Sequence, residues 1–122
     1  MPSSNVTMET ELPELFRRRE QVAPERFTFH AARMRMTQVT PEALAAMNGQ
    51  ADRCATELAD AECDALAYAC LVAVMVSGSG AHQRIQADLM ETCGGSPVVT
   101  SAGAEVKLAS CCGGGPATNR AC

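Results

Sequence analysis

A cysteine stands near the start of the apolar run YACLVAVMV (residues 68–76), and its thiol is the first candidate for chemistry. Cysteine attacks electrophiles as the thiolate, a form that a helix N-terminus or nearby hydrogen-bond donors favour. The run by itself leaves two interpretations of Cys70 open, because a free cysteine is also a common buried hydrophobe. We interpret the histidines, His30 and His82, as structural, since they fall on a predicted strand and at the start of a predicted helix.

The sequence predicts neither a metal site nor a cofactor. The stretch SGSG at 77–80 lacks the lysine and the spacing of a phosphate-binding loop. Cys111, Cys112 and Cys122 match no common zinc spacing, because no C-x-x-C pair or nearby histidine accompanies them.

Composition narrows the class of protein. A chain of 122 residues, 47% hydrophobic and 20% charged, predicts one globular domain. Only 3% of the residues are aromatic, so the core is expected to be aliphatic. The net charge of −4 argues against a nucleic-acid-binding surface. The one basic cluster, Arg17–Arg19, is flanked by Glu14 and Glu20 and is interpreted as a solvated helix end.

Targeting signals and membrane spans are not expected. The first residues, MPSSNVTMETELPE, lack an apolar segment of the kind found in signal peptides. The longest apolar run, residues 65–76, is shorter than the roughly 20 residues that span a bilayer. Seven cysteines, an odd number, favour free thiols over a disulfide framework. Together these features predict a cytoplasmic protein.

The elements that must position Cys70 alternate along the chain. Hydrophobic spacing and capping residues predict a helix within 7–20, a strand near 26–34, a helix from Thr40 to about Leu58, a strand over 64–76, a helix over 82–93 and a strand near 97–104. Such alternation predicts an α/β fold with a parallel sheet flanked by helices. Ligands of these folds bind beyond the carboxyl ends of the strands, where Cys70 and the pair Thr100–Ser101 are expected.

Both ends of the sequence depart from a regular α/β pattern. A strand normally leads into a loop such as PSSN, and with such a strand Asn5 would reach the same sheet edge as Cys70. From about Glu105 the sequence loses its periodicity and becomes rich in glycine and cysteine. We therefore expect a partial N-terminal α/β domain at 1–104 and a disordered tail at 105–122.

Several separated motifs, in order, resemble the maleate cis-trans isomerases of the aspartate/glutamate racemase superfamily. They are PSSNVTMETELPELF, RFTFHAARMRMTQVTPEALAAM, DALAYACLVAVMV and VVTSAGA, and the resemblance covers about residues 2–104. Members of this family are two-domain α/β enzymes about twice as long, in which two similar halves face each other across a cleft. The resemblance is to the first half only, so the fold is expected to be the incomplete first half of a two-domain racemase-like fold.

The resemblance implies roles for four positions. Cys70 corresponds to the nucleophile that adds to the double bond of maleate, allowing rotation and release of fumarate. Asn5 corresponds to an asparagine whose amide holds a substrate carboxylate, and the backbone N–H groups of Leu71 and Val72 contact the same ligand. A second cysteine, which donates a proton, belongs to the other half. The family further implies a small dicarboxylate substrate, no cofactor and a homodimer.

Two alternatives stay open beside the isomerase. One is a cysteine-dependent racemase or decarboxylase of the same superfamily. The other is an inactive or unstable fragment, because a sheet that lacks a strand loses core contacts that are large beside a net stability of about 5–15 kcal/mol.

Overall fold

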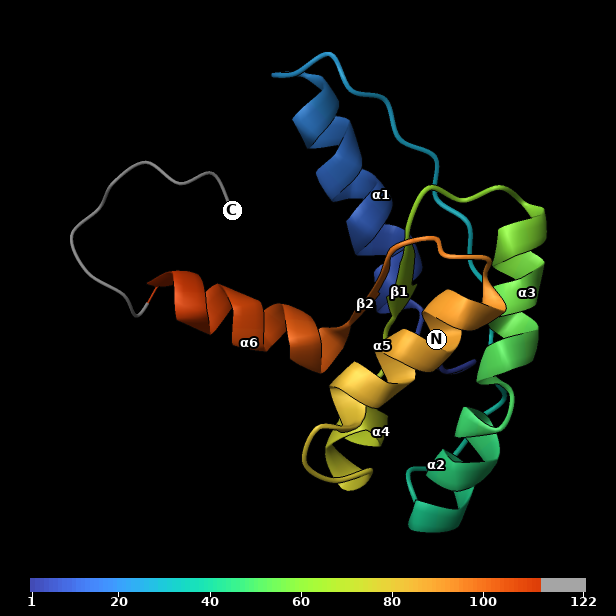
Figure 1. Ribbon diagram of the computed structural model, residues 1–122. Helices are drawn as coiled ribbons and strands as arrows, with labels where there is room; N and C mark the ends of the chain where they lie inside the picture. The colour runs from blue at the N-terminus through green and yellow to red at the C-terminus, as the bar shows by residue number, and fades with distance from the viewer. Residues whose placement is uncertain (113–122) are drawn as a thin grey trace.

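The computed structural model describes residues 1–112, and of these the side chains of residues 1–107. Six helices and two strands follow one another: α1 (Thr7–Glu20), α2 (Pro41–Asn48), α3 (Ala51–Asp60), β1 (Leu66–Tyr68), α4 (Leu71–Val76), α5 (Ala81–Thr92), β2 (Val98–Thr100) and α6 (Ser101–Cys112). Figure 1 shows the two strands at the centre, with α1 and α6 extending away from the body of the molecule.

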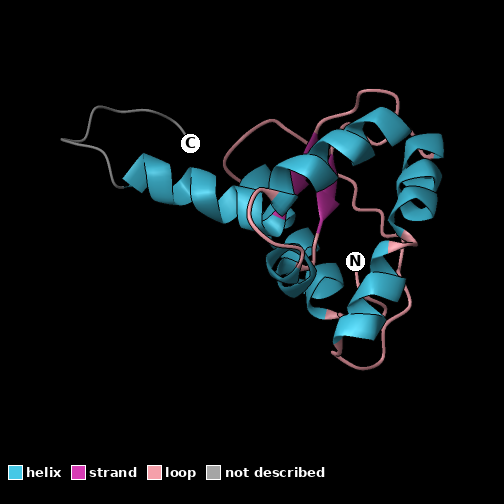
Figure 2. Ribbon diagram, turned by 60° about the horizontal axis from the view of Figure 1, so that its bottom comes forward, coloured by secondary structure: helices cyan, strands magenta, loops and turns pink. Residues whose placement is uncertain are grey.

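The two strands form a parallel sheet with Leu66 opposite Val98 and Tyr68 opposite Thr100. The chain between them passes through α4 and α5, which is the crossover that parallel neighbours require. Figure 2 shows this sheet lying among the helices. The predicted α/β class, a parallel sheet flanked by helices, is therefore confirmed.

The core lies on one face of this sheet. Leu66 and Tyr68 of β1 and Val98 and Thr100 of β2 are buried, whereas the alternate residues between them are exposed. Met47 and Ala73 are fully buried in the same cluster, which also includes Cys54, Leu89 and Cys93. The core is thus aliphatic and rich in methionine and cysteine, as the scarcity of aromatic residues predicted.

The helix predicted from Thr40 begins there but is divided in two. The Thr40 hydroxyl accepts a hydrogen bond from the Ala43 N–H at 3.2 Å, which confirms the predicted cap. The break falls at Gly49 and Gln50, between α2 and α3. Glycine is a poor helix former, and the Gln50 side chain accepts instead from the Arg35 N–H at 3.0 Å.

Two predicted strands are wrong or too long. Residues 26–33 are extended but pair with no strand of the described chain, and a bridge joins Met34 to Pro2. In the predicted strand over 64–76, only Leu66–Tyr68 is a strand, and Leu71–Val76 is the helix α4. A short apolar run fits a buried strand and a buried helix equally well, so its periodicity could not decide between them.

The elements after residue 97 also differ from the prediction. The strand predicted near 97–104 ends at Thr100, and the helix α6 begins at Ser101. The boundary predicted after Ala104 falls inside this helix, which continues to Cys112. The rest of the predicted tail, including Cys122, lies outside the described residues.

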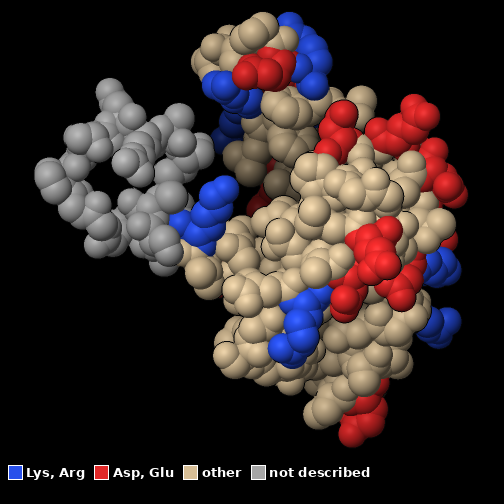
Figure 3. Space-filling view, viewed as in Figure 1, with Lys and Arg blue, Asp and Glu red and all other residues tan. Residues whose placement is uncertain are grey.

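The basic cluster of α1 lies at the solvent-exposed end of that helix, as predicted. Arg17 and Arg18 both pair with Glu14, and Arg19 pairs with Glu25, with every partner about half exposed or more. Figure 3 shows blue basic side chains around a red acidic group at the top of the molecule, and both red and blue side chains along the right-hand side.

Candidate active site

Cys70 lies where β1 gives way to α4. It has an extended backbone (φ −149°, ψ 92°) and occupies the N-cap position of that helix, its carbonyl accepting from the Val74 N–H at 3.3 Å. Burial of Ala73 and Val74 anchors the helix and fixes the position of the cysteine. The thiol is free, and the residue is 8% exposed.

The backbone N–H groups that follow Cys70 are hydrogen-bond donors without acceptors. The first N–H groups of any helix have no partner within the helix. Those of Leu71 and Val72 have none elsewhere in residues 1–112. Leu71 is half-buried and the Val72 side chain is 46% exposed, so this end of α4 stands near the surface. Two adjacent donors next to a thiol are suited to hold an anionic oxygen.

The end of β2 supplies two hydroxyl groups at the same edge of the sheet. The pairing of Tyr68 with Thr100 places Ser101, one residue beyond β2, beside the end of β1 that leads to Cys70. The fully buried Thr100 hydroxyl accepts from the Gly103 N–H at 3.0 Å. The Ser101 hydroxyl is buried and, among the described residues, has no hydrogen-bond partner. Burying an unpaired hydroxyl is costly, so this group is open to a ligand.

Asn5 lies in the loop before α1 and caps that helix. Its side-chain oxygen accepts from the N–H groups of Thr7 at 3.1 Å and Met8 at 3.4 Å. These bonds fix the orientation of the amide. Its NH₂ group has no partner within the described chain and can donate to a ligand.

The loop PSSN is held against the segment RMRM by a dense set of hydrogen bonds. The Ser3 N–H donates to the Met34 carbonyl at 2.7 Å, and the Ser3 hydroxyl accepts from the Met36 N–H at 3.0 Å. Arg33 donates to the Ser3 carbonyl and pairs with Glu9 of α1. The sequence analysis missed this role of Arg33. The nearby acidic Glu9 is the signal that could have indicated it.

The structure brings the predicted site residues together only in part. Cys70, Leu71 and Val72 are contiguous, whereas no hydrogen bond within residues 1–112 joins Asn5 to any of them. The Met1 amine donates to the Ala32 carbonyl at 3.2 Å and is largely buried. Burial lowers the pKa of this amine below its ordinary value of 8.0.

The neighbouring side chains are poor substitutes for Cys70. Burial raises the pKa of the Cys54 thiol, which favours the neutral and unreactive form. Burial also raises the pKa of Tyr68 beyond its usual range, and its hydroxyl donates to the Asn48 side chain. The ring of the exposed His30 contacts the Thr28 hydroxyl at 3.2 Å.

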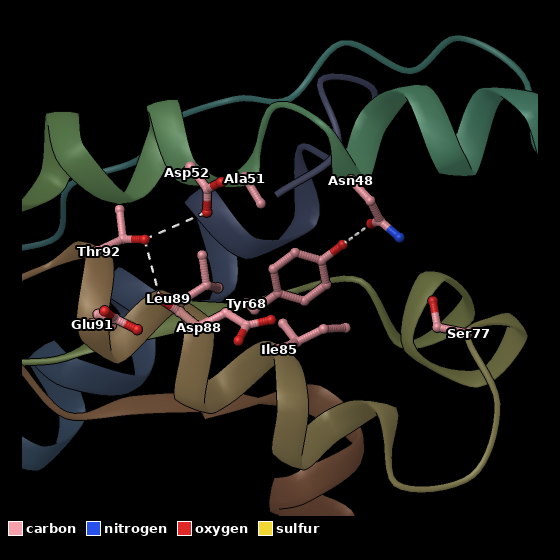
Figure 4. Close-up of a pocket in the computed structure, with 10 residues that line it drawn as sticks. All are labelled: Asn48, Ala51, Asp52, Tyr68, Ser77, Ile85, Asp88, Leu89, Glu91 and Thr92. Atoms are coloured by element: carbon pink, nitrogen blue, oxygen red, sulfur yellow. Dashed lines mark hydrogen bonds between the residues drawn. The ribbon is translucent and has the colours of Figure 1, made fainter.

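A separate cavity of about 560 Å³ opens between α3 and α5. Figure 4 shows Tyr68 bonded to Asn48 on one side of it and Thr92 turned toward Asp52 on the other. The lining carboxylates, which include Asp88 and Glu91, would repel a dicarboxylate. None of the predicted site residues lines this cavity, so the candidate site is the end of β1.

Metal and membrane features were sought in the same residues. Within the described part of the chain, no cluster of three or more His, Cys, Asp or Glu side chains is arranged to hold a metal ion. None of the described helices is both long and apolar enough to cross a bilayer.

Comparison with known proteins confirms the resemblance found in the motifs. No protein-family profile matches the sequence. A curated maleate isomerase of Pseudomonas putida is 52% identical over 111 residues, which are 88% of this chain and 44% of that protein. The crystal structure of a cysteine-to-alanine variant of the maleate isomerase Iso from Pseudomonas putida S16 with maleate is 51% identical, with a TM-score of 0.90 over 93% of this chain and 47% of that one.

A third relative was solved with a reaction intermediate. It is a mutant of the maleate cis-trans isomerase of Nocardia farcinica with a covalently bound succinylcysteine, 50% identical with a TM-score of 0.81 over 89% of this chain and 45% of that one. The chain thus spans slightly less than half the length of the relatives it matches. In both sequence and fold, it is similar to the N-terminal half of the maleate isomerases.

Proposed function

We propose that this chain carries the nucleophilic half of a maleate cis-trans isomerase site, with Cys70 as the attacking residue. The observation that supports this most directly is the placement of a free cysteine at the carboxyl end of β1, beside two unpaired backbone N–H groups. This placement lies within a fold and a sequence that are about half identical to enzymes named maleate isomerases.

The reaction requires a temporary single bond between the two central carbons of maleate. The Cys70 thiolate donates an electron pair to one olefinic carbon and forms a carbon–sulfur bond. The π electrons move to the other carbon and into its carboxylate. After rotation, the same electrons re-form the double bond and expel the thiolate, which leaves fumarate. No net oxidation or reduction occurs, so the step requires no redox partner.

The substrate is a dianion, so its binding depends on donors. We assign one carboxylate to the NH₂ group of Asn5, whose orientation is fixed by the helix cap. The N–H groups of Leu71 and Val72 hold charge that develops on a carboxylate while the thiolate is bound. The unpaired Ser101 hydroxyl, at the same sheet edge, supports an additional polar contact.

A succinyl adduct, as named for the Nocardia farcinica enzyme, contains one hydrogen more on carbon than the addition of a thiolate supplies. A proton donor must therefore face Cys70, and the same group must take the proton back from carbon as the double bond re-forms and the thiolate leaves. The resemblance implies a second cysteine in the other half of the fold, and a homodimer of complete subunits in the cytoplasm. This chain supplies the nucleophile and one side of the substrate cleft.

The test is conversion of maleate to fumarate, followed by proton NMR. We expect turnover with this chain joined to, or mixed with, the second half of a relative, and its loss in Cys70→Ser. Cys63→Ser is the matched control, because Cys63 is a half-buried free cysteine outside the site. Mass spectrometry of the chain with maleate is expected to place an adduct on Cys70.

Other outcomes separate the alternatives. Turnover that persists in Cys70→Ser would contradict the proposal. Conversion of an amino-acid enantiomer or loss of carbon dioxide from a substituted malonate, without maleate turnover, would favour the racemase or decarboxylase. A far-UV spectrum of a disordered chain, with neither turnover nor adduct, would favour the unstable fragment.

A further inference from the structure

The connection between β1 and α4, which carries Cys70, is held by few backbone bonds. The parallel pairing of the sheet ends where Tyr68 lies opposite Thr100. Within residues 1–112, the N–H groups of Ala69 and Cys70 have no acceptor. On the side of α4, the Cys70 carbonyl accepts from the Val74 N–H at 3.3 Å. On the other side, the position of Cys70 depends on what holds the end of β1.

The end of β1 is held by a side chain of α2. Tyr68 is 5% exposed, and its hydroxyl donates to the side-chain oxygen of Asn48. Figure 4 shows the Tyr68 ring turned toward Asn48 at the end of α2. Asn48 is the last residue of that helix, whose Leu44 and Met47 are buried in the core. The acceptor is therefore carried by an anchored helix, and the bond ties β1 to it.

Tyr68 and Cys70 lie on the same face of the extended chain. Leu66, Tyr68 and Cys70 are buried, whereas Ala67 is exposed and Ala69 is half-buried. Cys70 keeps an extended backbone although it lies beyond the strand. Side chains two residues apart in such a segment point to the same side. A shift of Tyr68 is therefore passed to the thiol through two extended residues.

The bond between Tyr68 and Asn48 persists over the pH range in which a thiolate forms. Burial raises the pKa of Tyr68 beyond its usual range, so its hydroxyl stays protonated and remains a donor. The amide of Asn48 does not titrate. The pair is therefore neutral, and it fixes the end of β1 without adding charge beside the thiol.

We propose that Asn48 and Tyr68 are a positioning pair for the Cys70 thiol. This inference rests on the proposed function, in which that thiol attacks an olefinic carbon. In this role neither residue contacts the substrate, because Asn48 acts through Tyr68 and Tyr68 acts through the chain leading to Cys70. Attack on a double bond requires a defined approach, and a misplacement of about 1 Å can slow a reaction about a hundredfold.

The first test measures maleate turnover by this chain joined to the second half of a relative. Tyr68→Phe and Asn48→Leu each remove the bond and are expected to lower kcat by about tenfold or more. KM is expected to change by no more than about twofold, because the donors that hold the carboxylates are unchanged. Asn48→Asp keeps an oxygen that accepts from Tyr68 and is expected to retain most of the wild-type kcat.

Thr92→Val is the matched control for these variants. The Thr92 hydroxyl lines the same cavity as the Tyr68–Asn48 bond, and it donates to the Asp88 carbonyl at 3.0 Å and to the Asp52 carboxylate at 3.5 Å. These bonds lie within and between α5 and α3 and do not reach β1. The control is therefore expected to keep the wild-type kcat and KM.

The second test needs no substrate, so it separates failure of this inference from failure of the proposed function. The chain alone is alkylated with iodoacetamide, and mass spectrometry measures the rate at each cysteine. Tyr68→Phe and Asn48→Leu are expected to speed alkylation of Cys70 about fivefold or more, because the freed end of β1 exposes the thiol. Cys54 and Cys93 are buried to a similar extent and are expected to react at unchanged rates.

Three results would overturn the inference. The first is an unchanged alkylation rate at Cys70 in both variants. The second is equal acceleration at Cys54 and Cys93, which would show that the whole core is loosened. The third is a full kcat in variants whose Cys70 reacts faster with iodoacetamide. Turnover that persists in Cys70→Ser, with selective acceleration at Cys70 in the pair variants, would instead reject the proposed function and leave the positioning pair in place.

Discussion

The two faces of the β1–β2 sheet differ in how completely the chain covers them. The face that carries Leu66, Tyr68, Val98 and Thr100 is closed by α2, α3 and α5, and residues such as Met47 are fully buried there. The other face carries Ala67 and Val99, and Val99 is 44% exposed. An amphipathic helix buries its apolar side chains only where another element packs against them. None of the residues of α1 is buried.

This difference bears on the candidate site, which lies at the boundary between the two regions. Cys70 takes its position from the closed face, through β1 and the buried residues of α4. Asn5 takes its position from the open region, through the loop held by Arg33 and Ser3. The nucleophile is thus rigidly placed, whereas its proposed substrate ligand depends on the less covered part of the molecule.

The largest effect is expected from Met47→Ala in the closed core. Met47 is fully buried, so its truncation leaves a cavity and is expected to lower the free energy of unfolding by about 2–5 kcal/mol. Urea unfolding measures this. Leu15→Ala on α1, where the side chain is 55% exposed, is the control and is expected to change stability by no more than about 0.5 kcal/mol. Similar losses in both variants would mean that the two regions are equally packed.

A smaller loss is expected from Thr100→Val. Valine keeps the shape of the side chain but removes the hydroxyl that accepts from the Gly103 N–H at the start of α6. Loss of such a cap costs about 0.5–2 kcal/mol, again measured by urea unfolding. Thr92→Val, at a half-exposed hydroxyl, is the matched control. A Thr100 variant as stable as that control would show that the cap does not hold α6.

The buried amine of Met1 predicts that the stability of the chain depends on pH. Burial lowers its pKa below 8.0, so the unfolded chain binds the proton more tightly than the folded one. Stability from this group is therefore expected to rise with pH up to about 8 and then to level off. Urea midpoints of chains that retain Met1, with and without N-terminal acetylation, measure this effect. The acetylated chain is expected to lack this component, and identical pH profiles would contradict it.

The smallest effect is expected from Leu12→Ala. Leu12 lines a groove beside β1 but is only half-buried, and alanine is a strong helix former. We expect a change in unfolding free energy within about 0.5 kcal/mol. A loss as large as that of Met47→Ala would show that α1 already has a packed surface beneath it, and the contrast between the two faces would fail.

Local signals in the sequence predicted several elements correctly. Thr40 marked the start of α2, and Leu44, Met47 and Cys54 within the predicted helix are all buried. The region of α5 and the strand core at Val98–Thr100 were found in the same way. These signals are local because a cap or an amphipathic stripe acts within a few turns of one helix.

Other features depended on distant partners. Residues 26–33 have a strand-like sequence, yet within the described residues they pair with no strand, and the sheet there consists of β1 and β2. The sequence LVAVMV became α4 because Ala73 and Val74 pack into the core while Val72 and Met75 stay exposed. The roles of Arg33 and of the unpaired Ser101 hydroxyl likewise arise from contacts that periodicity does not encode.

By itself the sequence determined the α/β class, the aliphatic core, and the motifs that identify Cys70 as a nucleophile by resemblance. Only the tertiary structure decided that Cys70 caps a helix instead of lying within a strand, and that one face of the sheet is closed while the groove beside β1 is open. The physical reason is that helix caps and apolar spacing are properties of neighbouring residues. Strand pairing and burial are properties of segments far apart in the chain, and they are completed only where both partners are present.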